Sequence, residues 1–78
     1  MPHIPKDEID RCIGKRISVR RKLLGMDEKA LAQAAGISLY SLRRYESARS
    51  TISAPALNAI AEELGVEFGY FFHGLDAR

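Results

Sequence analysis

The chain has one cysteine, no tryptophan and no long apolar run. A single cysteine excludes an intramolecular disulfide and any cysteine-based zinc finger, so nothing in the sequence indicates secretion. No apolar stretch approaches the ~18 residues that a membrane-spanning helix needs, and the N-terminal MPHIPKDEID lacks the apolar core of a signal peptide. These absences predict a cytoplasmic protein with no membrane partner.

The usual groupings of catalytic and metal-binding residues are also missing. His3 and His73 lie far apart, and neither has a second ligand at the spacing of a metal site. Glu62 and Glu63 are adjacent, so on a helix they point in different directions and do not form a catalytic carboxylate pair. Cys12 lies between apolar helix positions, where we expect a buried, inert thiol. We therefore expect no enzyme, no metal site and no cofactor.

Charge is present but unevenly distributed. With 46% hydrophobic residues, six glycines and three prolines, the 78 residues are typical of one packed globule. The formal net charge is only +2, yet residues 11–22 carry six basic side chains and no acid. A second basic cluster consists of Arg43, Arg44 and Arg49. Segregation of this kind predicts a basic face that attracts a polyanion, whereas the alternative is an ordinary solvated helix surface.

Apolar residues recur at helical spacing along the chain, and no stretch alternates strictly enough for a strand. The expected helices span residues 7–24, 28–35, 39–47, the segment between Ser53 and Gly65, and part of VEFGYFFHG. Asp27 and Ser38 can cap helix N-termini, and Gly36 suits the end of the second helix. The sequence thus predicts an all-α fold, a compact bundle of about five short helices. We expect a flexible N-terminal arm over residues 1–6, one domain over 7–74 and a tail over 75–78.

Residues 31–45 meet the requirements of a helix-turn-helix unit, in which two helices are joined by a short turn containing glycine. Ala32 is small enough for the helices to approach closely, and Gly36 tolerates a left-handed backbone. Ile37 and Leu42 supply apolar anchors beyond the turn. The same seam is completed by Leu31, Ala35 and Tyr45. Each feature alone is weak, but this order of features predicts the helix-turn-helix.

The segment LAQAAGISLYSLRRYESA resembles the core of the Cro and phage-repressor (XRE) family of DNA-binding domains. IGKRISVRRKLLGM resembles that family's first helix and turn, and LNAIAEELGVEFGYFF resembles its fourth and fifth helices. The resemblance covers residues 9–74. It implies a lambda-repressor-like helical bundle whose second and third helices form the unit that binds double-stranded DNA.

The resemblance also implies roles for individual residues. Base edges in the major groove are expected to meet Leu39, Tyr40 and Arg44. The expected contacts to the DNA backbone come from Ser38, Arg43 and Arg49. The remaining match, Independently, a planar guanidinium suits the O6 and N7 atoms of guanine, and an exposed leucine suits a thymine methyl.

The basic run of the first helix has two interpretations. Most of its side chains fit an ordinary solvent-facing surface, and Arg16 is the one that we expect to add a contact to the DNA backbone. The chain departs from the family pattern at three positions. Glu28 replaces a usual Gln that helps to bind phosphate, Ala48 replaces a usual Gly, and Ile52 replaces a usual Pro.

The function that we expect is sequence-specific regulation of transcription, with a homodimer acting as a small repressor by occupying its operator. The aromatic residues of EFGYFFHG either close the core or, at Phe68 or Tyr70, form a dimer patch. The alternative function is an antitoxin-like or scaffolding module whose main role is to bind a partner protein. A third possibility is generic coating of nucleic acid, which predicts binding without sequence preference.

Overall fold

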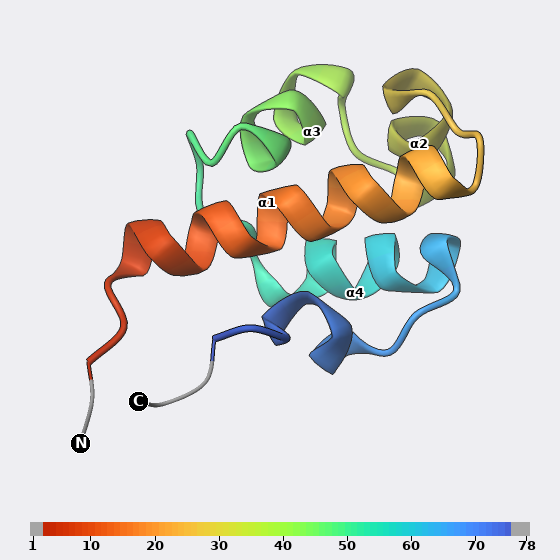
Figure 1. Cartoon of the computed structure of the whole chain (residues 1–78). Coiled ribbons are helices and arrows are strands. Elements are labelled where there is room, and N and C mark those ends of the chain that lie inside the picture. Colours follow the sequence, from red (N-terminus) through yellow and green to blue (C-terminus); the bar gives the residue numbers. More distant parts are fainter. Residues whose placement is uncertain (1–2, 76–78) are drawn as a thin grey trace.

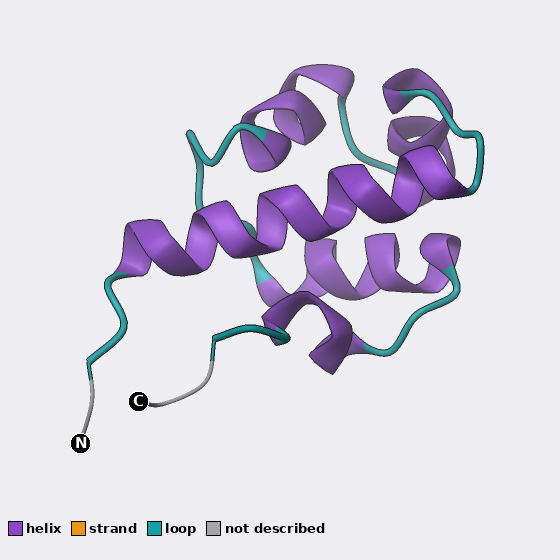
Figure 2. Ribbon diagram, viewed as in Figure 1, coloured by secondary structure: helices purple, strands orange, loops and turns teal. Residues whose placement is uncertain are grey.

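The structure is a computed structural model that describes residues 3–75. It contains α1 (Lys6–Leu23), α2 (Glu28–Ala35), α3 (Leu39–Glu46), α4 (Ala54–Leu64) and the 3-10 helix η1 (Phe68–Phe72). Figure 2 shows these helices joined by short loops, with no strand within residues 3–75. The predicted all-α fold is confirmed, and the fifth helix is a short 3-10 helix. The ends of the expected arm and tail, residues 1–2 and 76–78, lie outside the described residues.

The long helix α1 organises the bundle (Figure 1). α3 packs on one side of α1, and η1 and α4 pack on the other, while α2 contacts both α3 and α4. No helix within residues 3–75 has the length and apolar character needed to cross a membrane. The arrangement leaves α3 on the outside of the molecule, supported from behind by α1 and α2.

The core is formed by apolar residues from every helix. Its buried members are Ile13, Ile17, Leu31, Ala32, Leu42, Leu57, Ile60, Ala61, Leu64 and Phe71. In α1 and α4 they recur at three- and four-residue intervals, so each of these helices buries one stripe and exposes the rest. Tyr70 and Phe72 pack partly buried against this core, whereas Phe68 is 39% exposed. The aromatic segment therefore closes the core and leaves one ring at the surface.

Local hydrogen bonds fix the ends of the helices as expected. The side chains of Asp27, Ser38 and Ser53 accept hydrogen bonds from backbone N–H groups three residues ahead, at 2.7, 3.0 and 3.3 Å. Gly36, with φ of 72°, ends α2 in the left-handed conformation. α1 differs, because it begins after Pro5 without a side-chain cap and already includes Lys6, the last residue of the expected arm.

A close approach between α1 and the end of α3 depends on Gly14. A Cβ atom at this position would lie 2.8 Å from the carbonyl oxygen of Glu46, and nearer still to that of Tyr45. Both obstacles are backbone atoms, so no side-chain movement makes room. Gly14 therefore sets how closely α3 is held against α1, which in turn sets the position of the exposed face of α3.

Candidate nucleic-acid interface

The unit formed by α2 and α3 has one buried and one exposed side. Leu31 and Ala32 of α2 and Leu42 of α3 are buried, with exposed fractions of 2% or less. At the turn, the amide N–H of Ile37 donates to the carbonyl oxygen of Ala32 at 3.0 Å. These contacts confirm the predicted seam, and they direct the opposite side of α3 to the surface.

Tyr40 and Arg44 lie together on this exposed side of α3. They are four residues apart, which places them on the same helix face. The Tyr40 side chain belongs to a residue that is 70% exposed, and the guanidinium carbon of Arg44 lies 5.7 Å from the centre of its ring. Leu39, the residue before Tyr40, is half-buried at the start of the helix. An exposed ring stacked with a cation at a helix surface presents both an apolar and a hydrogen-bonding surface.

The guanidinium of Arg44 is also held by the loop that follows α3. Its Nε donates to Ser50 Oγ at 2.7 Å, and its Nη2 donates to the carbonyl oxygen of Arg49 at 2.8 Å. Thr51 ties the same loop to α1, because its hydroxyl donates to Asp10 Oδ2 at 3.0 Å. The Arg44 side chain is therefore half-buried and oriented rather than free in solvent.

Arg43 has an acidic neighbour that the sequence did not predict. Its Nε lies 3.4 Å from Glu28 Oε1, and the two side chains are 63% and 30% exposed. Glu28 is the first residue of α2, so the pair joins the N-terminus of α2 to the outer side of α3. The negative charge reduces the positive potential that Arg43 presents to an anion.

Ser38 and Arg49 lie at the two ends of α3. Ser38 is exposed, accepts from the amide of Ser41 and also hydrogen-bonds with the Ser41 hydroxyl at 2.9 Å. Arg49 is exposed in the loop after α3, and its amide N–H donates to the carbonyl oxygen of Arg44 at 2.8 Å. The structure thus brings the expected base-reading and backbone-contacting residues of α3 to a single edge of the molecule.

Arg21 and Glu46 lie behind this edge. Two hydrogen bonds join them, Nε to Oε2 at 2.9 Å and Nη2 to Oε1 at 3.0 Å, and the side chains are 9% and 8% exposed. Nη1 of Arg21 donates to the carbonyl oxygen of Met26. The bonds to Glu46 raise the pKa of Arg21 above its ordinary value, although burial acts in the opposite direction. The pair is geometrically suited to hold α1 and α3 together and has little exposure to a partner.

Arg16 is not at this edge, contrary to our expectation. Its Nη2 donates to the carbonyl oxygen of His73 at 3.0 Å, and its guanidinium lies over the ring of Tyr70. Gly14 faces α3, and residues two positions apart on a helix point in nearly opposite directions, so Arg16 faces η1. Charge density along the sequence did not show on which side of α1 each cation lies.

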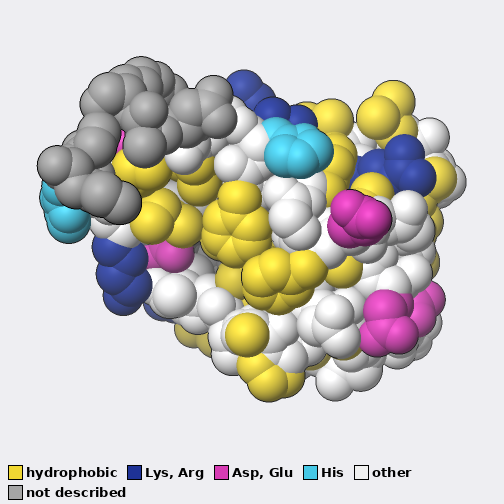
Figure 3. Space-filling model, turned by 90° about the horizontal axis from the view of Figure 1, so that it is seen from below, with side chains coloured by type: hydrophobic (Ala, Val, Ile, Leu, Met, Phe, Trp, Pro, Cys, Tyr) yellow, Lys and Arg dark blue, Asp and Glu magenta, His cyan; other side chains and the backbone are white. Residues whose placement is uncertain are grey.

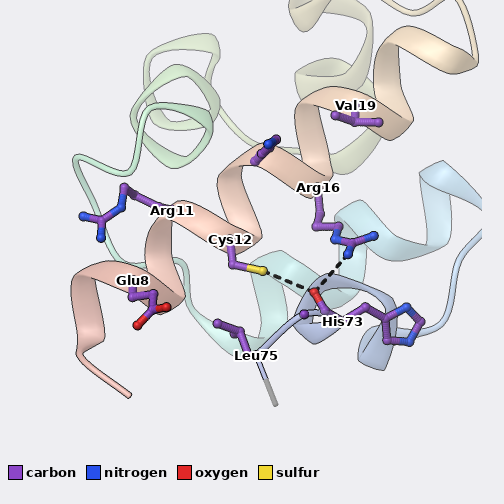
Figure 4. A pocket seen from close by; sticks show the side chains of 9 residues that line it. Glu8, Arg11, Cys12, Arg16, Val19, His73 and Leu75 are labelled. Atoms are coloured by element: carbon purple, nitrogen blue, oxygen red, sulfur yellow. Dashed lines mark hydrogen bonds between the residues drawn. The ribbon is translucent and has the colours of Figure 1, made fainter. Parts of the chain in front are cut away.

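An open groove lies on that opposite side, between α1 and the segment after η1. Figure 4 shows Cys12 and Arg16 converging on the carbonyl oxygen of His73, beside Val19 and Leu75. The Sγ atom of Cys12 also lies 3.5 Å from the carbonyl oxygen of Phe71. Cys12 is half-buried rather than fully buried as we expected, because η1 covers only part of this face.

Two contacts of the site had no signal in the sequence. Ser50 lies six residues after Arg44, and Glu28 lies fifteen residues before Arg43. Neither separation is a helical neighbour spacing, so each contact depends on the path of a loop or on the packing of two helices. Only a structure relates these side chains.

The fold and the exposed edge of α3 define a helix-turn-helix protein. The chain matches the model of the helix-turn-helix family HTH_3 over residues 17–71, and it belongs to this family. It is 38% identical over 68 residues to an uncharacterized transcriptional regulator in ATPase CF(0) region of Rhodospirillum rubrum, which covers 87% of the chain and 63% of that protein. The chain spans about half the length of other curated relatives that it matches, which are named as HTH-type transcriptional regulators.

Solved structures show the same architecture. An HTH_3 family transcriptional regulator from Vibrio cholerae has a TM-score of 0.82 and 28% identity, over 87% of the chain and 38% of that protein. The P22 c2 repressor, solved in complex with synthetic operator 9T, has a TM-score of 0.74 and 27% identity, over 80% of the chain and 94% of that protein. The predicted resemblance to phage-repressor domains is confirmed.

Proposed function

We propose that the chain binds double-stranded DNA by placing α3 in the major groove, and that it thereby regulates transcription. The observation that carries this proposal is the Tyr40–Arg44 stack on the exposed side of α3. A large exposed ring beside cations is an unfavourable surface unless a partner covers it. Membership of the HTH_3 family and the likeness to the P22 c2 repressor support the same conclusion.

Within this proposal the residues of α3 divide between two tasks. Leu39, Tyr40 and Arg44 contact base edges and supply sequence preference. Ser38, Arg43 and Arg49 contact phosphates, and they supply affinity that falls as salt rises. Arg16 takes no part, because its guanidinium is bound to His73 and Tyr70 on the other side of α1.

The protein is proposed to act as a cytoplasmic homodimer that represses by occupying two half-sites about one helical turn of DNA apart, or ~34 Å. The face carrying η1 supplies an apolar surface for the second copy. Figure 3 shows hydrophobic side chains gathered on this face. Phe68 is 39% exposed there, and its ring lies 5.5 Å from that of Phe72. Loss of dimer mass in light scattering for Phe68→Ser, with unchanged helicity, is the expected result.

The function is tested by fluorescence anisotropy with DNA from upstream of the protein's own gene. The wild type and Arg44→Ala are titrated into this duplex and into a shuffled duplex at two salt concentrations. The expected result is a preference for the native duplex that Arg44→Ala loses, while the control Arg16→Ala retains it. Equal salt-sensitive binding to both duplexes would contradict sequence-specific regulation and favour generic coating. No binding even at low salt would instead favour a module that binds a partner protein.

A further inference from the structure

The contacts of Arg44 leave one edge of its guanidinium available. The Nε–Nη2 edge is occupied by Ser50 Oγ and the carbonyl oxygen of Arg49, at 2.7 and 2.8 Å. Within residues 3–75, no hydrogen bond uses Nη1 of Arg44. A guanidinium carries five N–H donors, so the outer Nη1–Nη2 end still offers a donor from each nitrogen. Those two donors match the spacing of O6 and N7 of guanine.

The loop that holds Arg44 is itself fixed on both sides of Ser50. Before Ser50, the amide N–H of Arg49 donates back to the carbonyl oxygen of Arg44 at 2.8 Å. After Ser50, the hydroxyl of Thr51 donates to Asp10 Oδ2 on α1 at 3.0 Å. Ser50 is therefore a fixed acceptor, and its position is set by α1 as well as by α3.

We propose that Ser50 is a positioning residue for base recognition, which holds the Nη1–Nη2 edge of Arg44 toward the major groove before DNA binds. This inference rests on the proposed function and adds the α3–α4 loop to its specificity. Arginine loses much rotamer freedom when it is ordered, and a side chain that is already ordered loses less on binding. The gain applies only to the contact that Arg44 makes with a base, so it acts on sequence preference and not on phosphate affinity.

The test begins with a duplex selected by the wild-type protein from a randomised pool. Each base pair of that duplex is then substituted singly, and Kd is measured for the wild type, Arg44→Ala, Ser50→Thr and Ser50→Val. Threonine and valine have nearly the same shape, but only threonine keeps the hydroxyl. Ser47→Ala is the matched control, because its hydroxyl bonds only backbone carbonyl oxygens of α3 and does not touch the Arg44 guanidinium. Thermal melting of each variant checks that it is folded.

Arg44→Ala should abolish discrimination at one or two base pairs. Ser50→Val should weaken discrimination at those same base pairs by about threefold to tenfold, with unchanged affinity for a shuffled duplex. Ser50→Thr and Ser47→Ala should match the wild type. The inference is overturned if Ser50→Val discriminates as well as Ser50→Thr, or if it weakens every base pair equally. Failure of the wild type to enrich any duplex would overturn the proposed function itself, which is a separate result.

Discussion

Arg21 and Glu46 form a doubly hydrogen-bonded ion pair that joins α1 to the last residue of α3, with side chains only 9% and 8% exposed. A pair in this position fixes the C-terminal end of the helix that carries Tyr40 and Arg44. The pair therefore links the stability of the bundle to the placement of the proposed DNA-binding edge.

Removing one partner should be strongly destabilising. Glu46→Ala leaves the Arg21 guanidinium buried without an anion, and we expect a loss of about 3 kcal/mol in the free energy of unfolding. Urea denaturation measures this loss. The control is Arg11→Ala, which breaks an ion pair with Asp7 whose side chains are 63% and 73% exposed, and which should change stability by less than about 0.5 kcal/mol. Equal losses in the two variants would contradict a structural role for the buried pair.

Gly14→Ala should also destabilise the fold, by about 2 kcal/mol. The new methyl group meets the backbone carbonyl oxygens of Tyr45 and Glu46, so α3 must move away from α1. Gly69→Ala is the matched control, because a Cβ there has no atom within 4 Å and its φ is not in the left-handed region. Thermal unfolding compares the two. A Gly14→Ala variant as stable as Gly69→Ala would show that the helices are not in close contact.

Ala48→Gly should stabilise the protein by about 0.5 to 1 kcal/mol. Ala48 follows α3 with a φ of 61°, a conformation in which its Cβ is strained and glycine is not. The reverse is expected of Ala34→Gly on the exposed side of α2, which should lose about 1 kcal/mol because glycine is a poor helix former. Chemical denaturation measures both changes. A loss of stability in Ala48→Gly would exclude the left-handed conformation at this position.

Glu28→Gln should raise affinity for DNA without changing sequence preference. The substitution frees Arg43 from its ion pair and removes a negative charge from the proposed interface. We expect tighter binding to preferred and shuffled duplexes alike, and a salt dependence steeper by up to about one phosphate contact. Glu62→Gln removes the same charge from the exposed surface of α4 and should leave both properties unchanged. If Glu28→Gln binds like Glu62→Gln, Arg43 is not a phosphate contact.

The helices and their ends were predictable because their causes are local. Ser38 caps α3 through the amide only three residues ahead, and Gly36 ends α2 through its own backbone conformation. The buried seam at Leu31 and Leu42 was predictable for a similar reason, since apolar spacing alone decides which side of a helix is buried. These features need no knowledge of which element lies opposite.

Contacts between distant segments were not predictable in this way. Arg16 meets the carbonyl oxygen of His73 across 57 positions, so its side of α1 became clear only when η1 was placed. Spacing placed Arg44 on the exposed side of α3, but not against Ser50, because that contact depends on how the next loop turns. Likewise, Glu28 was visible as a departure from the family pattern, whereas its ion pair with Arg43 was not.

The placement of DNA on α3 is tested most directly by NMR. Nitrogen-15-labelled protein is titrated with the selected duplex, and changes in backbone amide chemical shift are mapped along the chain. The account predicts that the largest changes fall on residues 38–44 and on the start of α2. The opposite pattern, with the largest changes in α4 and η1 and none in α3, would contradict it.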